Sequence, residues 1–368
     1  KKPKLHSIVD RIKAKTKVPA ISAAIITADF IEQYAVGVRQ ANGKSQATLN
    51  DRFHIGSVTK SVTSTIAAQL VEAGKIKWET TVNEIFPDFA SKIDPQLRNV
   101  TLEQLLSHRS GLAGYESGEE LLSAGNYGGT PVEQRFSFAM DLLTQPPKYR
   151  VGSFNYSNAG YGIAGAMIER VAKESWESLV QSSLIDTLGG SALIGWPGFN
   201  NPQAPWGHFE KGTLYHQKGE LFTAHDPNDP NNLYFRFPSA LAPSGDLSLN
   251  VNDLSSYVQL HLRGLMGQDT ILKSSTVKRL HKANPEPIFG ATFYSSGWLE
   301  GEIDGVATSL HDGSADTFYC IAAIQPSFGK AAVVIVNAGG KLGNRAAAMT
   351  IEKLMGIKNL KTFGQGIK

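Results

Sequence analysis

Apolar residues recur every four positions over residues 58–70, and this spacing predicts a helix with one buried face. We expect the helix to run from Ser61 to Ala73. Its apolar stripe consists of Val58, Val62, Ile66 and Leu70. Gly74 follows, at the position where helices commonly end in a left-handed residue.

Two apolar runs near the N-terminus lack helical periodicity. Ala20–Thr27 and Ile31–Val38 predict adjacent strands joined by a turn at residues 28–30. A helical stripe precedes them, formed by Leu5, Ile8, Val9 and Ile12. This stripe predicts a surface helix packed on the sheet, although the lysines around it would also suit a membrane surface.

The middle of the chain changes character at about residue 195. Residues 80–190 are mostly helical in pattern, whereas Pro, Asn and Gly in residues 195–238 predict long loops. The expected helices are Leu102–Leu106, Val132–Leu143 and Ile163–Ala172. The loops carry Trp196, Trp206, Tyr215, Tyr234 and Phe235. Such residues either line binding sites or pack beneath the loops.

The C-terminal third returns to a helix and then to strands. The expected elements are a helix at Val251–Leu265, strands at Ser296–Leu299, Phe318–Ile324 and Ala331–Asn337, and a last helix at Asn344–Leu354. Strands at both ends of the chain with helices between them predict an α/β fold. We expect an antiparallel sheet flanked by helices, with an inserted, mostly helical domain. Residues 1–78 and 236–368 would form the α/β domain, and residues 79–235 the helical, loop-rich insertion.

Composition narrows the function classes. The 368 residues are 41% hydrophobic and 19% charged, and the net charge of +3 is too small to indicate nucleic-acid binding. No apolar run is long enough for an integral membrane segment. The chain begins at Lys1 rather than methionine, so we expect that an upstream segment was cut away, either a signal peptide or a part of the chain left out for another reason. With a signal peptide, the protein would be periplasmic or secreted. A cytoplasmic location stays open.

Neither cysteine nor histidine indicates a metal or a cofactor. The single cysteine, Cys320, excludes an internal disulfide and lies in an apolar strand pattern. None of the nine histidines belongs to a His-Glu-x-x-His motif, and His208, His216 and His225 are irregularly spaced in predicted loops. We therefore expect no cofactor and no metal site.

Ser57-Val58-Thr59-Lys60 stands at the start of the predicted helix. Residues three apart on a helix lie on one face, so the Lys60 amine is expected beside the Ser57 hydroxyl. A serine needs such a neighbour to act as a nucleophile near neutral pH. The spacing recurs at Ser275–Lys278, and an N-cap serine followed by a solvated lysine would also explain it.

Two further motifs lie downstream. Tyr156-Ser157-Asn158 is expected in a loop before a helix, where the nearby lysine would lower the pKa of the phenol and make it a base. A plain turn is the alternative. His311-Asp312-Gly313 precedes a predicted strand and is followed by Ser314. Its glycine would let a substrate lie against the strand.

The order of these three motifs resembles the serine β-lactamase and penicillin-binding protein superfamily. The Tyr-x-Asn form is similar to class C β-lactamases, D-alanyl-D-alanine carboxypeptidases and family VIII carboxylesterases. The stretches Phe53–Lys60, Leu105–Leu112 and Tyr156–Tyr161 carry the same resemblance. It spans about residues 5 to 355 and implies the β-lactamase/transpeptidase-like fold.

The resemblance implies a role for each motif residue. Ser57 would be the nucleophile, Lys60 its activating partner and Tyr156 the proton carrier, with the serine proton going to either of the two. Asn158 would bind the acyl-side amide of the substrate, and His311 with Gly313 would contact the substrate in place of Lys-Thr-Gly. The backbone N–H groups of Ser57 and Ser314 would form the oxyanion hole.

The implied function is hydrolysis of an amide or ester bond through an acyl-enzyme. The resemblance points first to a D-alanyl-D-alanine carboxypeptidase, penicillin-binding-type or β-lactamase-related enzyme acting on a small molecule or peptide. A neutral His311 beside Asp312 binds a β-lactam carboxylate poorly, and Asp312 favours an amine. The alternatives are a family VIII-type carboxylesterase, a D-aminopeptidase-like amidase and a non-catalytic penicillin-binding or sensor domain. An α/β-hydrolase would need Gly-x-Ser-x-Gly, which is absent. The oligomeric state stays open.

Overall fold

The centre of the structure is a seven-stranded antiparallel sheet with the order β2-β1-β12-β11-β10-β9-β8. The computed structural model describes residues 4–199, 201–213, 217–229, 237–282, 284–358 and 360. The strands are β1 (Ala20–Thr27), β2 (Ile31–Gly37), β8 (Phe293–Tyr294), β9 (Leu299–Ile303), β10 (Val306–Ser314), β11 (Tyr319–Gln325) and β12 (Lys330–Val336). Because β1 pairs with β12, the two ends of the chain share one sheet.

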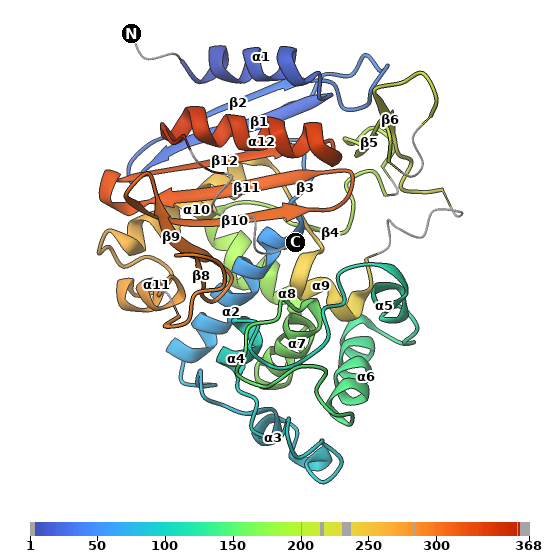
Figure 1. Cartoon of the computed structure of the whole chain (residues 1–368), viewed down its shortest axis with the longest axis vertical. Coiled ribbons are helices and arrows are strands. Elements are labelled where there is room, and N and C mark those ends of the chain that lie inside the picture. Colours follow the sequence, from blue (N-terminus) through green and yellow to red (C-terminus); the bar gives the residue numbers. More distant parts are fainter. Residues whose placement is uncertain are drawn as a thin grey trace.

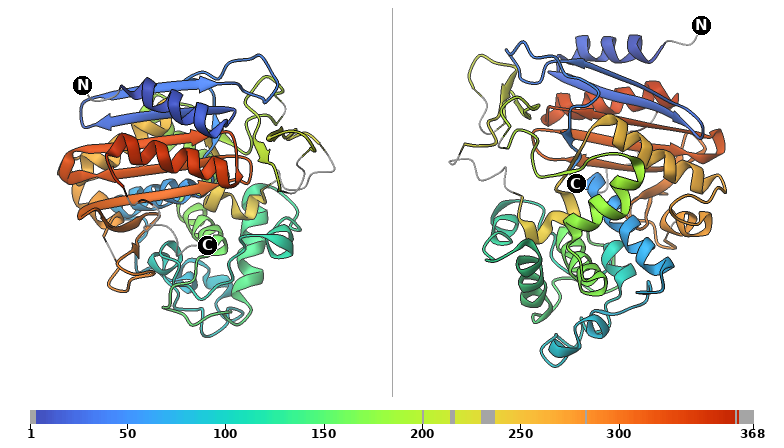
Figure 2. Two further views of the ribbon diagram at one scale, coloured as in Figure 1. Left: turned by 45° about the horizontal axis from the view of Figure 1, so that its top comes forward. Right: turned by 180° about the vertical axis from the view of Figure 1, so that it is seen from behind.

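Helices cover both faces of this sheet. The helices α1 (Leu5–Thr16) and α12 (Gly340–Met355) lie on one face, and α10 (Val251–Leu265) lies on the other (Figures 1 and 2). Alternate residues of β12 serve the two sides, as the two-residue period of a strand requires. Val334 and Val336 pack in the cluster that contains α1 and α12 residues, whereas Val333 and Ile335 pack in the cluster that contains α10 residues. This double coverage explains why β12 is almost continuously apolar.

The remaining helices form a layer on the α10 side, below the sheet in Figure 1. They are α2 (Thr59–Glu72), α3 (Val82–Ile85), α4 (Leu102–Leu106), α5 (Gly118–Ser123), α6 (Pro131–Leu143), α7 (Asn158–Ala172), α8 (Trp176–Leu179), α9 (Ala242–Gly245) and α11 (Ser274–Leu280). Helix α2 packs against α7, α9 and α11, so it is buried on nearly every side and not only along its apolar stripe.

Two small sheets complete the fold. The strands β3 (Phe53–His54), β7 (Leu247–Leu249) and β4 (Leu193–Ile194) form one, and β5 (His208–Glu210) and β6 (Phe222–Ala224) form the other. The last two lie in the segment predicted to be loops. Tyr215, His216, Tyr234 and Phe235, which the sequence analysis singled out there, lie outside the described residues.

Most predicted elements are confirmed, but the edge of the sheet formed by β8, β9 and β10 differs. The strand predicted at Ser296–Leu299 is wrong, because Gly297 adopts a positive φ of 81° and Ser295 N–H donates to Trp298 O in a tight turn. The strand begins only at Leu299, and β10 was not predicted as a separate element. Helix α7 begins at Asn158, so Asn158 belongs to a helix and not to a loop.

The predicted fold class is confirmed, while the division into a 1–78/236–368 domain and a 79–235 insertion stays a prediction. Cys320 is buried in β11, as expected. Among the helices of the described residues, none combines the length and the apolar character that a bilayer span requires.

Candidate active site

Ser57 lies in a short 3-10 turn (Gly56–Val58) between β3 and α2. The preceding His54 fixes this turn, because its Nδ1 accepts the N–H of Gly56 while its Nε2 lies 3.2 Å from Asp246 Oδ1. Gly56 has a positive φ of 52°, and a Cβ there would stand 2.8 Å from Ser314 N. The glycine therefore lets the turn lie against the end of β10.

Lys60 reaches Ser57 from the first turn of α2. Its Nζ lies 3.1 Å from Ser57 Oγ, 2.7 Å from Asn158 Oδ1 and 2.7 Å from Ser244 O. Asn158 Oδ1 and Ser244 O can only accept, so they take two of the N–H groups. The third position on the nitrogen faces Ser57 Oγ and becomes a lone pair when the amine is neutral.

Burial allows a substantial fraction of Lys60 to be a neutral amine near pH 7. Lys60 has no solvent exposure, and no carboxylate forms an ion pair with it among the described residues. Loss of hydration lowers the pKa of Lys60 to about 7, although Glu116 and Asp312 act in the opposite direction. An ordinary lysine would be almost entirely protonated at this pH.

Tyr156 lies beside Lys60, but the electrostatic expectation for its phenol is wrong. Lys60 Nζ lies 4.7 Å from the centre of the Tyr156 ring. Burial raises the pKa of Tyr156 well above its ordinary value, and a hydrogen bond with Ser57 only partly offsets this effect. The predicted lowering by a lysine charge is not found, because burial raises the pKa of Tyr156 and the nearby Asp312 and Glu116 raise it further. The phenol therefore keeps its proton at neutral pH.

Asn158 is held by the start of α7. Its Nδ2 donates to Tyr115 O at 2.9 Å, which fixes Oδ1 as the atom that faces Lys60. Ser157 caps the helix, since its Oγ accepts the N–H of Gly160 at 3.0 Å.

His311 and Gly313 lie on β10 opposite the Ser57 turn. The Nε2 of His311 lies 2.9 Å from the Tyr294 hydroxyl, and its Nδ1 lies 2.6 Å from Asp312 O. Burial lowers the pKa of His311 to about 4, so the ring is neutral at pH 7. A Cβ on Gly313 would lie 2.0 Å from Ile55 O. Close contact with the Ser57 turn thus explains the glycine, and the expected contact of Gly313 with a substrate stays a prediction.

The two expected oxyanion donors lie on adjoining segments. Contact of Gly56 with the backbone of Ser314 brings the Ser57 turn and the end of β10 together. In the described part of the sheet, β9 pairs with β10 only from Val306 to Leu310. The backbone of β10 from His311 to Ser314 therefore has no strand on that side.

A pocket of about 240 Å³ brings these residues together. It is lined by His54, Ser57, Glu116, Leu121, Tyr156, Asn158, Trp196, Phe237, Ser244, Gly245, His311, Asp312, Ser314, Ala315 and Asp316. Glu116 and Asp316 were not predicted as site residues, because they lie in loops outside the three motifs. The second Ser-x-x-Lys is elsewhere, on α11, where Ser275 and Lys278 are exposed.

The carboxylates of this pocket lack cationic neighbours in its wall. Glu116, Asp312 and Asp316 line it, whereas none of its described lining residues is Lys or Arg. Desolvation raises the pKa of Glu116, although the residue as a whole is exposed. Within the described chain, no group of three or more His, Cys, Asp or Glu residues is arranged to hold a metal ion.

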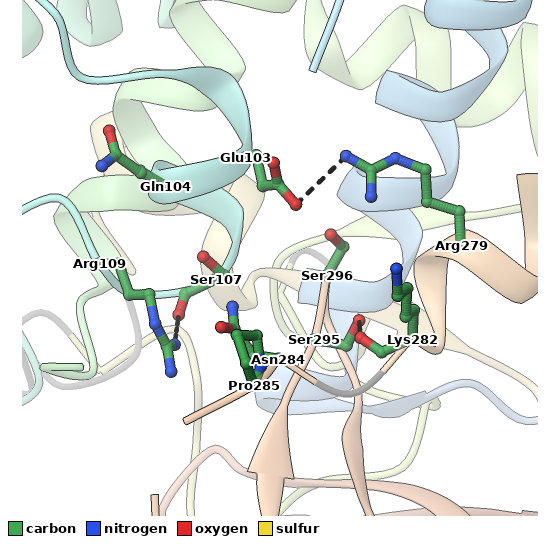
Figure 3. A pocket seen from close by; sticks show the side chains of 10 residues that line it. All are labelled: Glu103, Gln104, Ser107, Arg109, Arg279, Lys282, Asn284, Pro285, Ser295 and Ser296. Carbon is green, nitrogen blue, oxygen red and sulfur yellow. Dashed lines mark hydrogen bonds and ion pairs between the residues drawn. The ribbon is translucent and has the colours of Figure 1, made fainter. Parts of the chain in front are cut away.

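A second pocket of about 310 Å³, here called the outer pocket, lies on α4, the end of α11 and the turn before β9 (Figure 3). It is lined by Glu103, Gln104, Ser107, Arg109, Arg279, Lys282, Asn284, Pro285, Ser295 and Ser296. Arg279 forms an ion pair with Glu103 across it, at 3.2 Å. None of the motif residues lines this pocket.

Known proteins similar to this chain belong to the superfamily that the order of the three motifs indicates. The family model described as Beta-lactamase matches residues 5–354. Penicillin-binding protein 4 of Amycolatopsis lactamdurans is 26% identical over 338 residues, which cover 90% of this chain and 84% of that protein. An unguisins hydrolase of Aspergillus campestris is 23% identical over 344 residues, 90% of this chain and 60% of that protein.

Solved structures share the fold. The octameric penicillin-binding protein homologue from Pyrococcus abyssi superposes with a TM-score of 0.76 at 22% identity, covering 98% of this chain and 78% of that one. SurE superposes with a TM-score of 0.76 at 22% identity, covering 96% and 75%.

Proposed function

Because the chain belongs to the Beta-lactamase family, whose members are generally serine hydrolases, we propose that it cleaves an amide or ester bond through an acyl-enzyme on Ser57. The observation that carries this proposal is the buried Lys60 amine, 3.1 Å from Ser57 Oγ and with a pKa of about 7. A non-catalytic binding domain has no need of such a group.

In the acylation step, Lys60 is the base. Its neutral amine accepts the Ser57 proton as Oγ attacks the substrate carbonyl carbon, and a tetrahedral oxyanion forms. The backbone N–H groups of Ser57 and Ser314 stabilise that oxyanion. In similar sites, loss of one such donor typically lowers kcat by 10²–10³-fold. The raised pKa of Tyr156 supports this division of roles, since a phenol that keeps its proton is a donor and not the base.

The leaving group departs with a proton supplied through Tyr156. Tyr156 gives its proton to the leaving nitrogen or oxygen as the C–N or C–O bond breaks, and Lys60 returns the Ser57 proton to Tyr156. Water then attacks the ester carbon of the acyl-enzyme, its proton passes to Lys60, and Ser57 leaves with that proton. Atoms and charge balance over the cycle, so the reaction needs no cofactor.

The substrate contacts follow from the other motif residues. The Asn158 amide would bind the acyl-side amide of the substrate, and the open side of β10 at His311–Ser314 would pair with an extended segment. A penicillin-binding-type carboxypeptidase is the activity that the motifs suggest first. It requires recognition of a carboxylate, for which the neutral His311 is a weak partner.

The charge of the pocket favours a second candidate, an amidase that acts on substrates with a free amine. Glu116 and Asp312 are close enough to Lys60 to raise its pKa, and with Asp316 they line the space beside Ser57. A cationic ammonium group on the acyl side would offset these carboxylates, whereas a carboxylate would be repelled. This is the aminopeptidase-like alternative of the sequence analysis.

A panel of substrates separates these activities. It comprises a short-chain p-nitrophenyl ester, a chromogenic cephalosporin, a D-alanyl-D-alanine peptide, and D-alanine p-nitroanilide with its N-acetyl derivative as the matched pair. The D-configuration is chosen because SurE, which shares the fold, has been solved with D-Leu. We expect ester turnover, slow or absent cephalosporin turnover, and a kcat/KM at least about tenfold higher for the free amine than for its acetylated form.

Two variants decide between outcomes. Ser57→Ala must abolish turnover of every substrate, and turnover that survives this change would refute the acyl-enzyme proposal. Asp312→Asn should reduce the preference for the free amine while leaving ester turnover within a few fold. Equal rates for the free and acetylated anilides, or faster cleavage of the D-alanyl-D-alanine peptide, would refute the amine preference alone.

A further inference from the structure

His108 is a buried imidazole that contacts the Tyr156 motif but takes no part in the reaction described above. It follows the C-terminal end of α4, has no solvent exposure and adopts a positive φ of 60°. We propose that His108 is the positioning residue that holds the Tyr156 phenol at the site of proton transfer. This inference rests on the proposed function of Ser57, Lys60 and Tyr156.

His108 binds the backbone on both sides of Tyr156. Its carbonyl oxygen accepts the N–H of Asn155 at 2.8 Å, and its Nδ1 accepts the N–H of Ser157 at 3.0 Å. A single residue therefore fixes the backbone at the positions that precede and follow Tyr156. The left-handed backbone of His108 allows its carbonyl and its side chain to face the same segment, and His is among the residues that tolerate this conformation.

The ring of His108 also packs directly on the phenol ring. The two ring centres are 4.2 Å apart, with an angle of 34° between the planes. Tyr156 thus has the His108 ring and the Lys60 amine as close neighbours. Removal of the imidazole would leave the phenol free to move by an amount comparable to the proton-transfer distance, and a displacement of about 1 Å can cost 10²-fold in rate.

The same imidazole connects the second and third motifs. Its centre lies 4.5 Å from that of Tyr294, and the Tyr294 hydroxyl lies 2.9 Å from His311 Nε2. Tyr161 adds a further ring contact at 5.3 Å. His108 therefore sets the distance between Tyr156 and the segment that carries His311, a relation that neither motif can set alone.

Hydrogen bonding assigns the protonation state of the ring. Since Nδ1 accepts a backbone N–H, the proton of the neutral imidazole is on Nε2. No acceptor for Nε2 is found among the described residues, so this N–H lies among aromatic rings. A charged imidazole would be unfavourable here, because it would lie near Lys60 without a counter-ion.

The two residues beside His108 hold its segment from outside. Ser107 and Arg109 line the outer pocket, and Tyr156 does not (Figure 3). The Arg109 guanidinium donates to Ser107 O at 3.2 Å and to Glu286 O at 3.1 Å. These bonds link the backbone at His108 to the segment before β8 and limit its motion.

The test compares two replacements of His108. In His108→Asn, the amide oxygen can occupy the place of Nδ1 and accept the Ser157 N–H, and Asn tolerates a positive φ. In His108→Leu, the volume is largely kept but the acceptor is lost. With D-alanine p-nitroanilide, whose leaving amine needs a proton, we expect kcat/KM to fall about 10²-fold in His108→Leu and less than about tenfold in His108→Asn, with KM nearly unchanged in both.

A double-mutant cycle distinguishes positioning of the phenol from general loss of structure. If His108 acts through the Tyr156 hydroxyl, His108→Leu should have little effect in a Tyr156→Phe background, where that hydroxyl is absent. Losses that multiply would overturn the proposal, as would wild-type kcat/KM in His108→Leu. If His108→Leu does not fold, His108→Gln takes its place in the cycle, because its longer amide does not reach the Ser157 N–H in the same way.

His261→Asn is the matched control, since it replaces another fully buried histidine, on α10 beside Thr65 and His281. It should lower the melting temperature and leave kcat/KM within about twofold. A loss as large as that of His108→Leu would also overturn the proposal, because burial alone would then explain both. Failure of Ser57→Ala to abolish turnover refutes the proposed function instead, so the two failures are distinguishable.

Discussion

Two cationic regions of this protein differ in the way their charge is compensated. In the outer pocket, Arg279 lies 3.2 Å from the Glu103 carboxylate, and the two side chains are 35% and 43% exposed. At the candidate active site, Lys60 is completely buried. Its amine forms hydrogen bonds with the uncharged oxygens Asn158 Oδ1 and Ser244 O and with the Ser57 hydroxyl. The first cation has both water and a counter-ion, and the second has neither.

In the proposed mechanism, this difference separates a structural cation from a reactive one. An exposed ion pair such as Arg279–Glu103 contributes little to stability, because water already solvates both charges. Desolvation without a paired carboxylate destabilises the ammonium form, which is why the pKa of Lys60 is lowered to about 7. The reactivity of Lys60 thus depends on what surrounds it and not on its spacing from Ser57 alone.

Replacement of Lys60 should have the largest effect among changes that retain the nucleophile. Lys60→Met removes the base while its unbranched apolar side chain fits the buried position, so we expect kcat/KM for an ester substrate to fall about 10⁴-fold. Circular dichroism and the melting temperature would confirm that the variant is folded. A loss of less than tenfold would assign the serine proton to another group.

Tyr156→Phe should have the next largest effect. It removes one hydroxyl and keeps the ring between its neighbours, so packing is nearly unchanged while kcat/KM falls about 10²-fold or more. The loss should be greater for an anilide than for a p-nitrophenyl ester, because a nitrophenolate leaves without a proton. Near-normal turnover of the anilide would exclude the phenol as proton donor.

The pH dependence of kcat/KM measures directly how burial changes the ionisation of Lys60. Activity requires neutral Lys60, so kcat/KM should rise with pH through an apparent pKa of about 7 and decrease tenfold per unit below it. His311, whose pKa is about 4, stays neutral through this range and adds no second limb near 7.

Glu116→Gln provides the control for that pH profile. Glu116 raises the pKa of Lys60, so its neutralisation should move the limb to lower pH, while Glu103→Gln should leave the limb in place. A profile that is flat from pH 6 to pH 9 would contradict Lys60 as the base.

The smallest effect is expected in the outer pocket. Glu103→Gln breaks the exposed pair with Arg279, which should change the free energy of unfolding by less than about 1 kcal/mol. Ester turnover should stay within about twofold of wild type. A loss of activity similar to that of His108→Leu would show that the outer pocket is coupled to Tyr156.

Local patterns were sufficient to predict much of the fold and to nominate the candidate site residues, whose roles stay predictions. The four-residue stripe of α2 and the short, nearly continuous apolar runs of β1, β11 and β12 depend on neighbours in sequence, so they are visible in the chain. The strand predicted at Ser296–Leu299 was wrong because Gly297 forms a turn there, and the pattern of apolar residues does not indicate such a turn. Glu116 and Asp316 were missed for a different reason, since they come from loops without a motif.

The chain by itself determined the order of the three motifs and hence the candidate nucleophile, because that order is a property of the sequence. Only the tertiary structure decided the ionisation states. The Lys60 amine can be neutral near pH 7, the Tyr156 phenol keeps its proton, and His311 is uncharged. The tertiary structure also placed His108 against Tyr156, 48 positions further along the chain. A pKa depends on water and charge around a group, and these come from α7, α9 and β10, segments distant from Lys60 in sequence.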